Sequence, residues 1–387
     1  MLAPHPFRLF PNPNAGTPGV VVLPDGGFRR AKAEITSWPG YAPTPLLDLA
    51  DVARAAGLGS VQMKDEASRF GLGSFKALGG AYAVAQVLGA ELARRGVAAR
   101  AGSGELVAGI YAAATGGLTV TCATDGNHGR SVAWGAQRFG CRCVIYVHAT
   151  VSQGRVDAIA RYGAEVRRVA GTYDDAVREA ARVADAEGWF VISDTSYPGY
   201  TTVPVDVMQG YRVMAEEALD QWQGAAPTHC FMQGGVGGAA AAVSVQLRGR
   251  VVPRPMFVVA EPDRAACLLA SAEAGEPVAI PGDLDTLMAG LACGEPSILA
   301  WQELERAADA FTAVPDEAAV ACMRLLARQG IVAGESGVAG LAALLLAAAD
   351  PAARAALKLG PASRVLLFST EGATDPELYE RLVNDPA

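Results

Sequence analysis

The sequence has few charged residues. Asp, Glu, Lys and Arg make up 19% of its 387 residues, whereas hydrophobic residues make up 51%, a balance that argues against a disordered chain. The net charge is −8 and no dense run of Lys and Arg occurs, so neither nucleic acid nor an anionic membrane is expected as a partner. The N-terminus lacks a basic segment followed by a long apolar run, and the longest apolar run, near residue 345, is too short to span a bilayer. These features predict a soluble, cytoplasmic protein.

Several catalytic motifs are missing as well. The four histidines are His5, His128, His148 and His229. None has a partner at HExxH spacing, and neither GxSxG nor GxxxxGK[ST] occurs, which excludes zincin, nucleophile-elbow and P-loop chemistry; no metal site is expected. The seven cysteines include no CxxC pair, so most are predicted to be reduced core thiols. Cys267 and Cys293 lie in segments that could meet, and their redox state stays open.

A repeating strand–helix pattern is present instead. Strands are expected at 118–123, 143–148, 164–169 and 189–194, with helices between them. Strands that alternate with helices of 10 to 15 residues indicate parallel βαβ units. A second series begins with a strand at 228–233 and ends with a strand at 364–369, after a long Ala/Leu-rich helix.

The N-terminal part has too few strands to stand alone, so it is expected to join the C-terminal half. We therefore predict an α/β fold with two parallel-sheet domains. The large one is discontinuous and comprises residues 1–89 and 196–387. The small one, residues 90–195, is inserted into it.

The stretch "GGVGG" from Gly234 to Gly238 is a candidate phosphate site. It follows an apolar strand and precedes a helix, so its backbone N–H groups and the helix N-terminus can face an anion that the missing Cβ atoms let approach. A tight turn with close packing is the simpler explanation, but four glycines in five residues exceed what it needs. The same residues fit G-x-G-x-x-A, with Glu261 at the end of the next strand, so dinucleotide binding remains a remote alternative.

Two further polar residues are unusual in their surroundings. Lys76 in "GLGSFKALGG" lies among apolar residues and glycines, where desolvation would lower the pKa of an amine that must attack a carbonyl; a snorkelling helix lysine is the ordinary explanation. Asp125 in "ATDGNHGR" lies in a strand-to-helix turn, where an N-cap is the ordinary role of aspartate. Each ordinary explanation is the better one when its residue is taken alone.

Together, these pieces resemble a known family. "SFKALGG", "TDGNHGR", "GGVGG" and "STEGATDP" occur in the order found in the fold-type-II, tryptophan-synthase-like pyridoxal phosphate enzymes. "KDEASRFGLGSFKALGGAYA", "SDTSYPGYTTVPVDVMQGY" and "MAGLACGEP" are most similar to the diaminopropionate ammonia-lyases. The likeness runs from about residue 35 to 380 and makes the large domain the one expected to bind pyridoxal 5'-phosphate.

The resemblance implies specific roles towards the cofactor. Lys76, next to Phe75, would hold it as a Schiff base, and Asn127 would hydrogen-bond its ring hydroxyl. Backbone N–H groups of the glycine turn would bind its phosphate, through Gly234, Gly235, Val236, Gly237 and Gly238. Ser369 would face the pyridine nitrogen, with the adjacent Thr370 left open as the alternative.

The resemblance also implies a reaction, α,β-elimination of D- or L-2,3-diaminopropionate to pyruvate and ammonia. The two enantiomers present their α-hydrogens to opposite faces, so Lys76 would serve one face and Asp125 the other. Asp194 would hold the substrate's β-amino group or support Asp125. The substrate carboxylate would bind backbone N–H groups around the turn, at Thr124, Asp125, Gly126 and His128.

The nearest alternative is a serine or threonine dehydratase on the same fold. The family is usually homodimeric, and related enzymes often need a monovalent cation, for which the sequence names no ligands.

Overall fold

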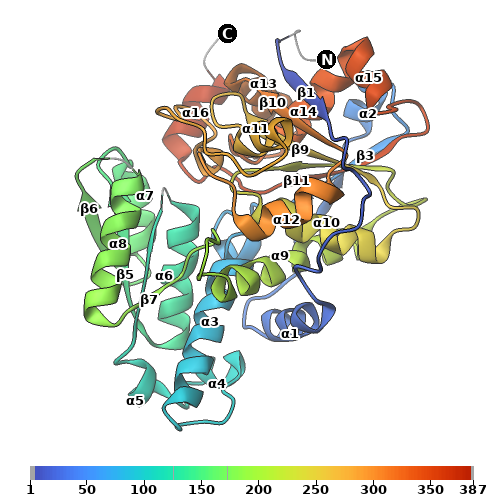
Figure 1. Cartoon of the computed structure of the whole chain (residues 1–387). Helices are drawn as coiled ribbons and strands as arrows, with labels where there is room; N and C mark the ends of the chain where they lie inside the picture. The colour runs from blue at the N-terminus through green and yellow to red at the C-terminus, as the bar shows by residue number, and fades with distance from the viewer. Residues whose placement is uncertain (1–4, 125, 172, 385–387) are drawn as a thin grey trace. The chain divides into compact units, whose positions relative to one another are not determined.

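A computed structural model describes residues 5–124, 126–171 and 173–384 (Figure 1). The chain forms two compact units. Unit 1 comprises the residues up to Val22, Pro43–Gly73 and the residues from Met214 onward, and unit 2 comprises Leu23–Ala42 and Ser74–Val213. Each unit contains one sheet, as expected for an α/β protein.

The limits of these units differ from the expected domain limits. Residues 74–89 and 196–213, expected in the large domain, belong to unit 2, as does the segment Leu23–Ala42. The segment from Ser74 carries helix α3 (Ala77–Arg94), which packs closely on other helices of unit 2 and therefore belongs with them.

Unit 1 is built on a seven-stranded sheet of order β1-β10-β9-β8-β11-β3-β2. Its strands are β1 (Arg8–Pro11), β2 (Leu46–Asp48), β3 (Ser60–Asp65), β8 (His229–Gln233), β9 (Met256–Pro262), β10 (Ala310–Val314) and β11 (Arg364–Ser369). The five inner strands are parallel, and the edge strands β1 and β2 pair antiparallel to β10 and β3. Its helices are α2 (Ala50–Ala56), η1 (Arg69–Gly71), α10 (Gly238–Arg250), α11 (Cys267–Ala274), η2 (Ala289–Leu291), α12 (Ile298–Ala307), α13 (Asp316–Ala327), α14 (Ala339–Ala349), α15 (Pro351–Ala356) and α16 (Pro376–Asn384).

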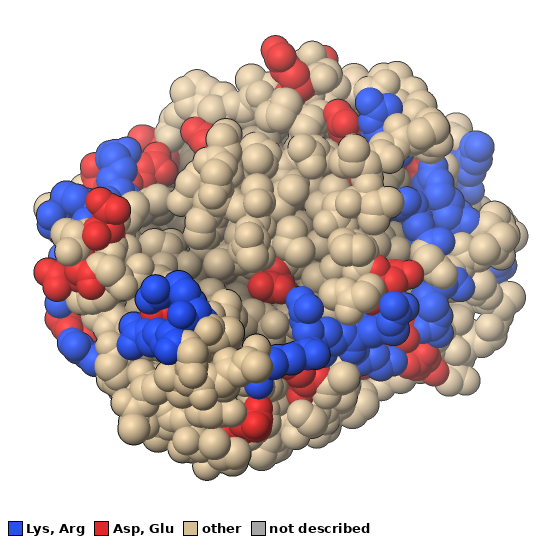
Figure 2. Space-filling view, turned by 60° about the horizontal axis from the view of Figure 1, so that its bottom comes forward, with Lys and Arg blue, Asp and Glu red and all other residues tan. Residues whose placement is uncertain are grey.

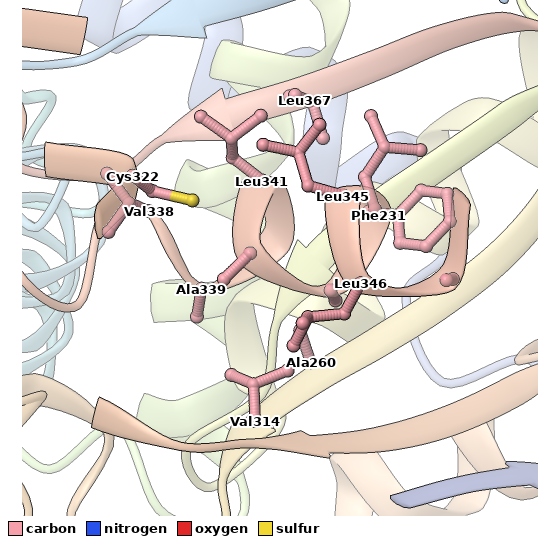
Figure 3. Close-up of a cluster of buried hydrophobic side chains, with 14 of the residues drawn as sticks. Phe231, Ala260, Val314, Cys322, Val338, Ala339, Leu341, Leu345, Leu346 and Leu367 are labelled. Atoms are coloured by element: carbon pink, nitrogen blue, oxygen red, sulfur yellow. The ribbon is translucent and has the colours of Figure 1, made fainter. Parts of the chain in front are cut away.

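The core of unit 1 lies between its sheet and α14. Figure 3 shows Leu341, Leu345 and Leu346 of α14 directed at side chains of four inner strands. Those side chains are Phe231 on β8, Ala260 on β9, Val314 on β10 and Leu367 on β11. Because α14 consists only of Ala, Leu and Gly, it contributes no polar group that would need a partner in the core.

Unit 2 is built on a four-stranded parallel sheet of order β6-β5-β4-β7. Its strands are β4 (Thr119–Ala123), β5 (Arg142–His148), β6 (Glu165–Val169) and β7 (Phe190–Val191). Its helices are α1 (Asp25–Thr36), α3, α4 (Ser103–Val107), α5 (Ala112–Thr115), α6 (Asn127–Phe139), α7 (Gln153–Ala160), α8 (Tyr173–Glu187) and the first part of α9 (Thr202–Gln221). Val144 and Tyr146 of β5 pack on α8 and Ile145 lies against α6, so alternate side chains serve the two faces of the sheet.

Glycines let α3, α6 and α9 approach one another in unit 2. A Cβ atom on Gly210 of α9 would lie 1.9 Å from the carbonyl oxygen of Leu78 in α3, and one on Gly79 would lie 2.4 Å from the ring of Tyr211. A Cβ atom on Gly80 would lie 2.0 Å from the hydroxyl of Ser131 in α6. A side chain at Gly79 or Gly210 would force α3 and α9 apart, whereas one at Gly80 would displace the Ser131 hydroxyl. These helices carry Tyr211 and the residue after Lys76.

Acidic and basic side chains are interspersed on the face that Figure 2 displays, with uncharged areas between them. Along the part of the chain that the structure describes, no helix has both the length and the hydropathy needed to cross a membrane.

Candidate active site

Lys76 is the residue just before α3, and its amine lies beside two aromatic rings and one carboxylate of unit 2. Its Nζ is 2.6 Å from Oδ2 of Asp194, 5.3 Å from the ring centre of Phe75 and 5.7 Å from that of Tyr211. The side chains of Lys76 and Asp194 are only 19% and 16% exposed. Burial disfavours the charged form of the Lys76 amine, whereas the Asp194 carboxylate favours it. The amine becomes a nucleophile once its proton has passed to another group.

Asp194 follows β7 in a loop held by Tyr200. The hydroxyl of Tyr200 donates to the carbonyl of Val191 and accepts the N–H of Ser193, which fixes the backbone on the N-terminal side of Asp194. Burial alone would raise the pKa of Asp194, but the charge of Lys76, the neighbouring His128 and the hydrogen bonds to the carboxylate together hold that pKa well below its usual range. Asp194 is therefore an anion at neutral pH.

His128, on α6, lies beside Asp194. Its Nε2 lies 2.7 Å from the carbonyl oxygen of Ile192, an acceptor, so Nε2 carries the proton. Burial lowers the pKa of His128, so the ring is neutral at pH 7. Its Nδ1 is 3.8 Å from Oδ2 of Asp194, and no hydrogen-bond partner for this nitrogen is present among the residues that the structure describes.

The turn before α6 is held by Thr124. Its hydroxyl accepts the N–H groups of Gly126 and Gly129, each at 3.0 Å, and its own N–H donates to the carbonyl of Tyr146 on β5. The N–H groups of Thr124 and Gly126 therefore already have acceptors within the protein, and their binding of the substrate carboxylate stays a prediction. Asp125 lies outside the described residues. Asn127 begins α6, and its Oδ1 accepts a hydrogen bond from Arg130 at 2.6 Å.

Tyr211, on α9, was missed by sequence reasoning. It is buried, and its ring packs on Phe75 at 4.6 Å between ring centres. Burial raises the pKa of its hydroxyl, for which the described residues offer no hydrogen bond of normal geometry. The motif "VMQGYRVMAEE" contains Tyr211 next to Gly210, and only the close approach of α9 to α3 shows that this tyrosine reaches Lys76.

The glycine turn of unit 1 connects β8 to α10 and fits a phosphate group. Gly235 and Gly237 have φ angles of 59° and 96°, which disfavour other residues. The N–H groups of Gly234 and Gly237 donate to carbonyls of Ala260 and Gly234. Those of Gly235 and Val236 have no acceptor among the described residues, and they lie at the N-terminus of a 13-residue helix, where an anion is stabilised.

Ser369 ends β11 in unit 1, Thr370 follows it, and both are buried. The hydroxyl of Thr370 accepts the amide of Gln233 at 3.2 Å, and the same amide also donates to Phe368 and Gly337. Among the residues that the structure describes, the hydroxyl of Ser369 has only a long contact of 3.4 Å with the carbonyl of Glu371. The hydroxyl of Ser369 therefore forms weaker hydrogen bonds within the protein than the hydroxyl of Thr370.

Glu261 does not serve a dinucleotide. Its two carboxylate oxygens accept the backbone N–H groups of Leu268 and Leu269 at 2.9 and 2.8 Å, so it caps α11. A Cβ atom on Gly234 would lie 2.7 Å from its Cγ, which shows how tightly it is packed beneath the glycine turn. Burial raises the pKa of Glu261 to about 8.

Replacing Glu261 by glutamine is expected to change how stability depends on pH. Between the ordinary pKa of 4.5 and about 8, the folded protein keeps a proton that the unfolded chain releases. Stability therefore falls as pH rises through this window, by up to about 1.4 kcal/mol per pH unit. Thermal unfolding at pH 5.5 and 8.0 should show a smaller loss of stability in Glu261→Gln than in the parent. The exposed Glu187→Gln should behave like the parent, and a Glu261→Gln variant with the parent's pH dependence would contradict the protonated carboxyl.

All seven cysteines are free thiols, Cys267 and Cys293 included. Burial raises the pKa of Cys267, so that thiol stays protonated at neutral pH. Among the described residues, no group of three His, Cys, Asp or Glu side chains could hold a metal ion.

The sequence matches a known enzyme family over most of its length. Residues 37–371 match the family described as "Pyridoxal-phosphate dependent enzyme". The diaminopropionate ammonia-lyase of Escherichia coli K12 is 40% identical over 355 residues, which cover 89% of this chain and 88% of that protein. An L-threonine dehydratase from the same organism is 29% identical over 162 residues, or 42% of this chain.

Solved structures agree with this result. The holo diaminopropionate ammonia-lyase from E. coli has a TM-score of 0.90 and 36% identity, covering 99% of this chain and 98% of its own. A structure of the E. coli enzyme in complex with D-serine has a TM-score of 0.89. The expected fold type, cofactor and enzyme class are thereby confirmed. The chain belongs to the diaminopropionate ammonia-lyase family of pyridoxal-phosphate-dependent enzymes.

Proposed function

We propose that this enzyme removes ammonia from 2,3-diaminopropionate and yields pyruvate and a second ammonia. The observation that carries the proposal is the pair of Lys76 and the buried Asp194 anion, 2.6 Å apart. A diamine substrate carries one more positive charge than serine or threonine, and a buried carboxylate binds such a charge strongly when the site excludes water.

Pyridoxal phosphate has an aldehyde and a phosphate, and this chain has a suitable group for each. Lys76 would bond to the aldehyde carbon, beside the ring of Phe75. The turn Gly234–Gly238 would hold the phosphate, chiefly through the N–H groups of Gly235 and Val236. Asn127 would face the ring hydroxyl and Ser369 the pyridine nitrogen. When bound, the cofactor supplies an electron sink for the bond that breaks at Cα.

The chain's own residues then move the protons. The substrate's α-amino group would replace the Lys76 amine at the aldehyde carbon. The freed Lys76 amine takes the α-proton from one enantiomer, and Asp125 takes it from the other, on the opposite face. The Cβ–N bond breaks and the β-amino group leaves as ammonia; water then releases pyruvate and the second ammonia. Asp194 stays charged and pairs with the substrate's β-ammonium instead of with Lys76. The substrate carboxylate lies at the N-terminal turn of α6, where the helix dipole favours an anion.

A pyruvate assay tests this function. The purified protein, loaded with pyridoxal phosphate, is given D- and L-diaminopropionate and, separately, D- and L-serine and threonine. We expect kcat/KM for at least one diaminopropionate enantiomer to exceed that for every hydroxy-amino acid. If serine or threonine were the better substrate, the enzyme would be a dehydratase and the role of Asp194 would be wrong.

Replacing Asp125 by asparagine should affect the two enantiomers unequally. Loss of the carboxylate removes the base for one face of the substrate, so we expect kcat on D-diaminopropionate to fall roughly 100-fold or more and kcat on the L-enantiomer to change far less. Parallel pyruvate assays on both enantiomers measure the ratio. Equal losses would instead make Asp125 a structural cap or an acid shared by both reactions.

We further propose that the enzyme is a cytoplasmic homodimer, by analogy with its family. Light scattering of the holoenzyme would report the oligomeric state, and fractionation of cells would report the compartment.

A further inference from the structure

The amide of Asn127 has a fixed orientation. Its Oδ1 accepts a hydrogen bond from Nη2 of Arg130 at 2.6 Å. A guanidinium only donates, so the atom facing it must be the amide oxygen, and the NH₂ group must lie on the other branch of the side chain. Asn127 therefore offers a donor, not an acceptor, on the side away from Arg130.

This orientation follows from the helix. Asn127 is the first residue of α6 and Arg130 is three residues later, so their side chains share one face. The N–H of Arg130 donates to the carbonyl of Gly126 at 2.9 Å, which sets Arg130 in the first complete turn. A charge-assisted hydrogen bond of this length also polarises the amide, and a polarised amide is a stronger donor through its nitrogen.

We propose that Arg130 is a positioning residue, which turns and polarises Asn127 so that its NH₂ group donates to the ring oxygen of pyridoxal phosphate. The inference rests on the proposed contact between Asn127 and the cofactor. Without Arg130 the amide could rotate and present its oxygen to the ring oxygen, and two acceptors repel. The ordinary alternative is that the pair only stabilises α6, as many pairs three residues apart do.

Binding of pyridoxal phosphate to the apoprotein separates these two possibilities. Dissociation constants are measured by quenching of protein fluorescence for the parent and for Arg130→Ala, Asn127→Ala and the double variant. We expect each single variant to bind roughly 10-fold more weakly. The double variant should bind no more weakly than Asn127→Ala, because Arg130 acts through Asn127. Arg130→Lys, which keeps a donor and the charge, should recover part of the loss.

A matched control removes the same charge elsewhere in unit 2. Arg142, at the start of β5, is exposed, so Arg142→Ala should bind the cofactor as the parent does. A second readout is the pH dependence of the absorbance of the lysine-bound cofactor. Loss of a donor to the ring oxygen and of a nearby positive charge should move its pKa upward by roughly one unit in Arg130→Ala.

Two results would overturn the proposal. One is parent-like cofactor binding in Arg130→Ala or Asn127→Ala. The other is a further 10-fold loss when Arg130→Ala is added to Asn127→Ala, which would show that Arg130 acts independently. The pyruvate assay on the parent enzyme decides the proposed function separately, since it does not depend on either variant.

Discussion

Replacing Lys76 by alanine is expected to reduce kcat roughly 10,000-fold or more. The variant loses the amine that bonds to the cofactor and, with it, the base for one face of the substrate. Asp194 also loses the cation that holds its pKa low, so a buried carboxylate is left without its partner. Single-turnover pyruvate formation measures the residual rate.

Borohydride reduction of the holoenzyme makes this prediction specific. The chain has four lysines, Lys32, Lys64, Lys76 and Lys358. Lys64 is buried and bonded to Glu217, Thr44 and Gln221, so its amine is not available. Peptide mapping should find the reduced cofactor on Lys76 alone, and none in Lys76→Ala. The exposed Lys358→Ala is the matched control and should retain parent activity; cofactor on any other lysine would contradict the assignment.

Replacing Asp194 by asparagine is expected to lower kcat/KM for diaminopropionate about 100- to 1,000-fold. Asparagine keeps the size of the side chain but not the charge, so the substrate's β-ammonium meets no anion in a partly buried site. Serine has no second ammonium, so the turnover of serine should fall much less. The measurement is the ratio of the two kcat/KM values in parent and variant.

Asp206→Asn is the control for this prediction. Asp206 also lies on unit 2, is largely buried and faces a cation, Arg30, at 3.6 Å; burial raises its pKa to about 6. It has no part in the proposed chemistry, so Asp206→Asn should keep the parent's preference between the two substrates. An equal loss on diaminopropionate and serine in Asp194→Asn would indicate that Asp194 supports the site in general rather than selecting a diamine.

The strand–helix periodicity of the sequence was sufficient to predict most inner strands. The predicted strands at 118–123, 143–148, 228–233 and 364–369 correspond to β4, β5, β8 and β11, because buried parallel strands have continuous apolar runs. For the N-terminal part the sequence predicted only that it has too few strands to stand alone, and its edge strand β1 and helix α1 were not predicted. Short edge elements have weak patterns because neighbours far along the chain, here β10 for β1, determine their pairing.

Some residues around Lys76 could be predicted from the sequence and others could not. Lys76 and the glycine turn can each be recognised from a short stretch of sequence. In the structure, the Lys76 amine lies beside a carboxylate, and the turn has the positive φ angles of a loop that can bind an anion. Two partners of Lys76 depend on long-range packing instead. The contact with Asp194 joins residues 118 positions apart, and Tyr211 reaches Lys76 only because two helices touch. The hydroxyl of Thr124 also competes for N–H groups of the turn, which residue types alone do not reveal.

The glycine contacts between α3 and α9 have a consequence for engineering. A methyl group at Gly79 or Gly210 would meet atoms of the facing helix within 2.4 Å, so a side chain at either position would disturb the packing of the helices beside Lys76. Variants of the enzyme that eliminate other groups from Cβ would therefore have to be sought at other positions. The segment around Asp194 offers such positions, because Tyr197, three residues on, is 48% exposed. Libraries directed at Tyr197 and Pro198, which are both exposed, with the helix glycines kept constant, should therefore retain folded enzyme while changing which amino acids it accepts.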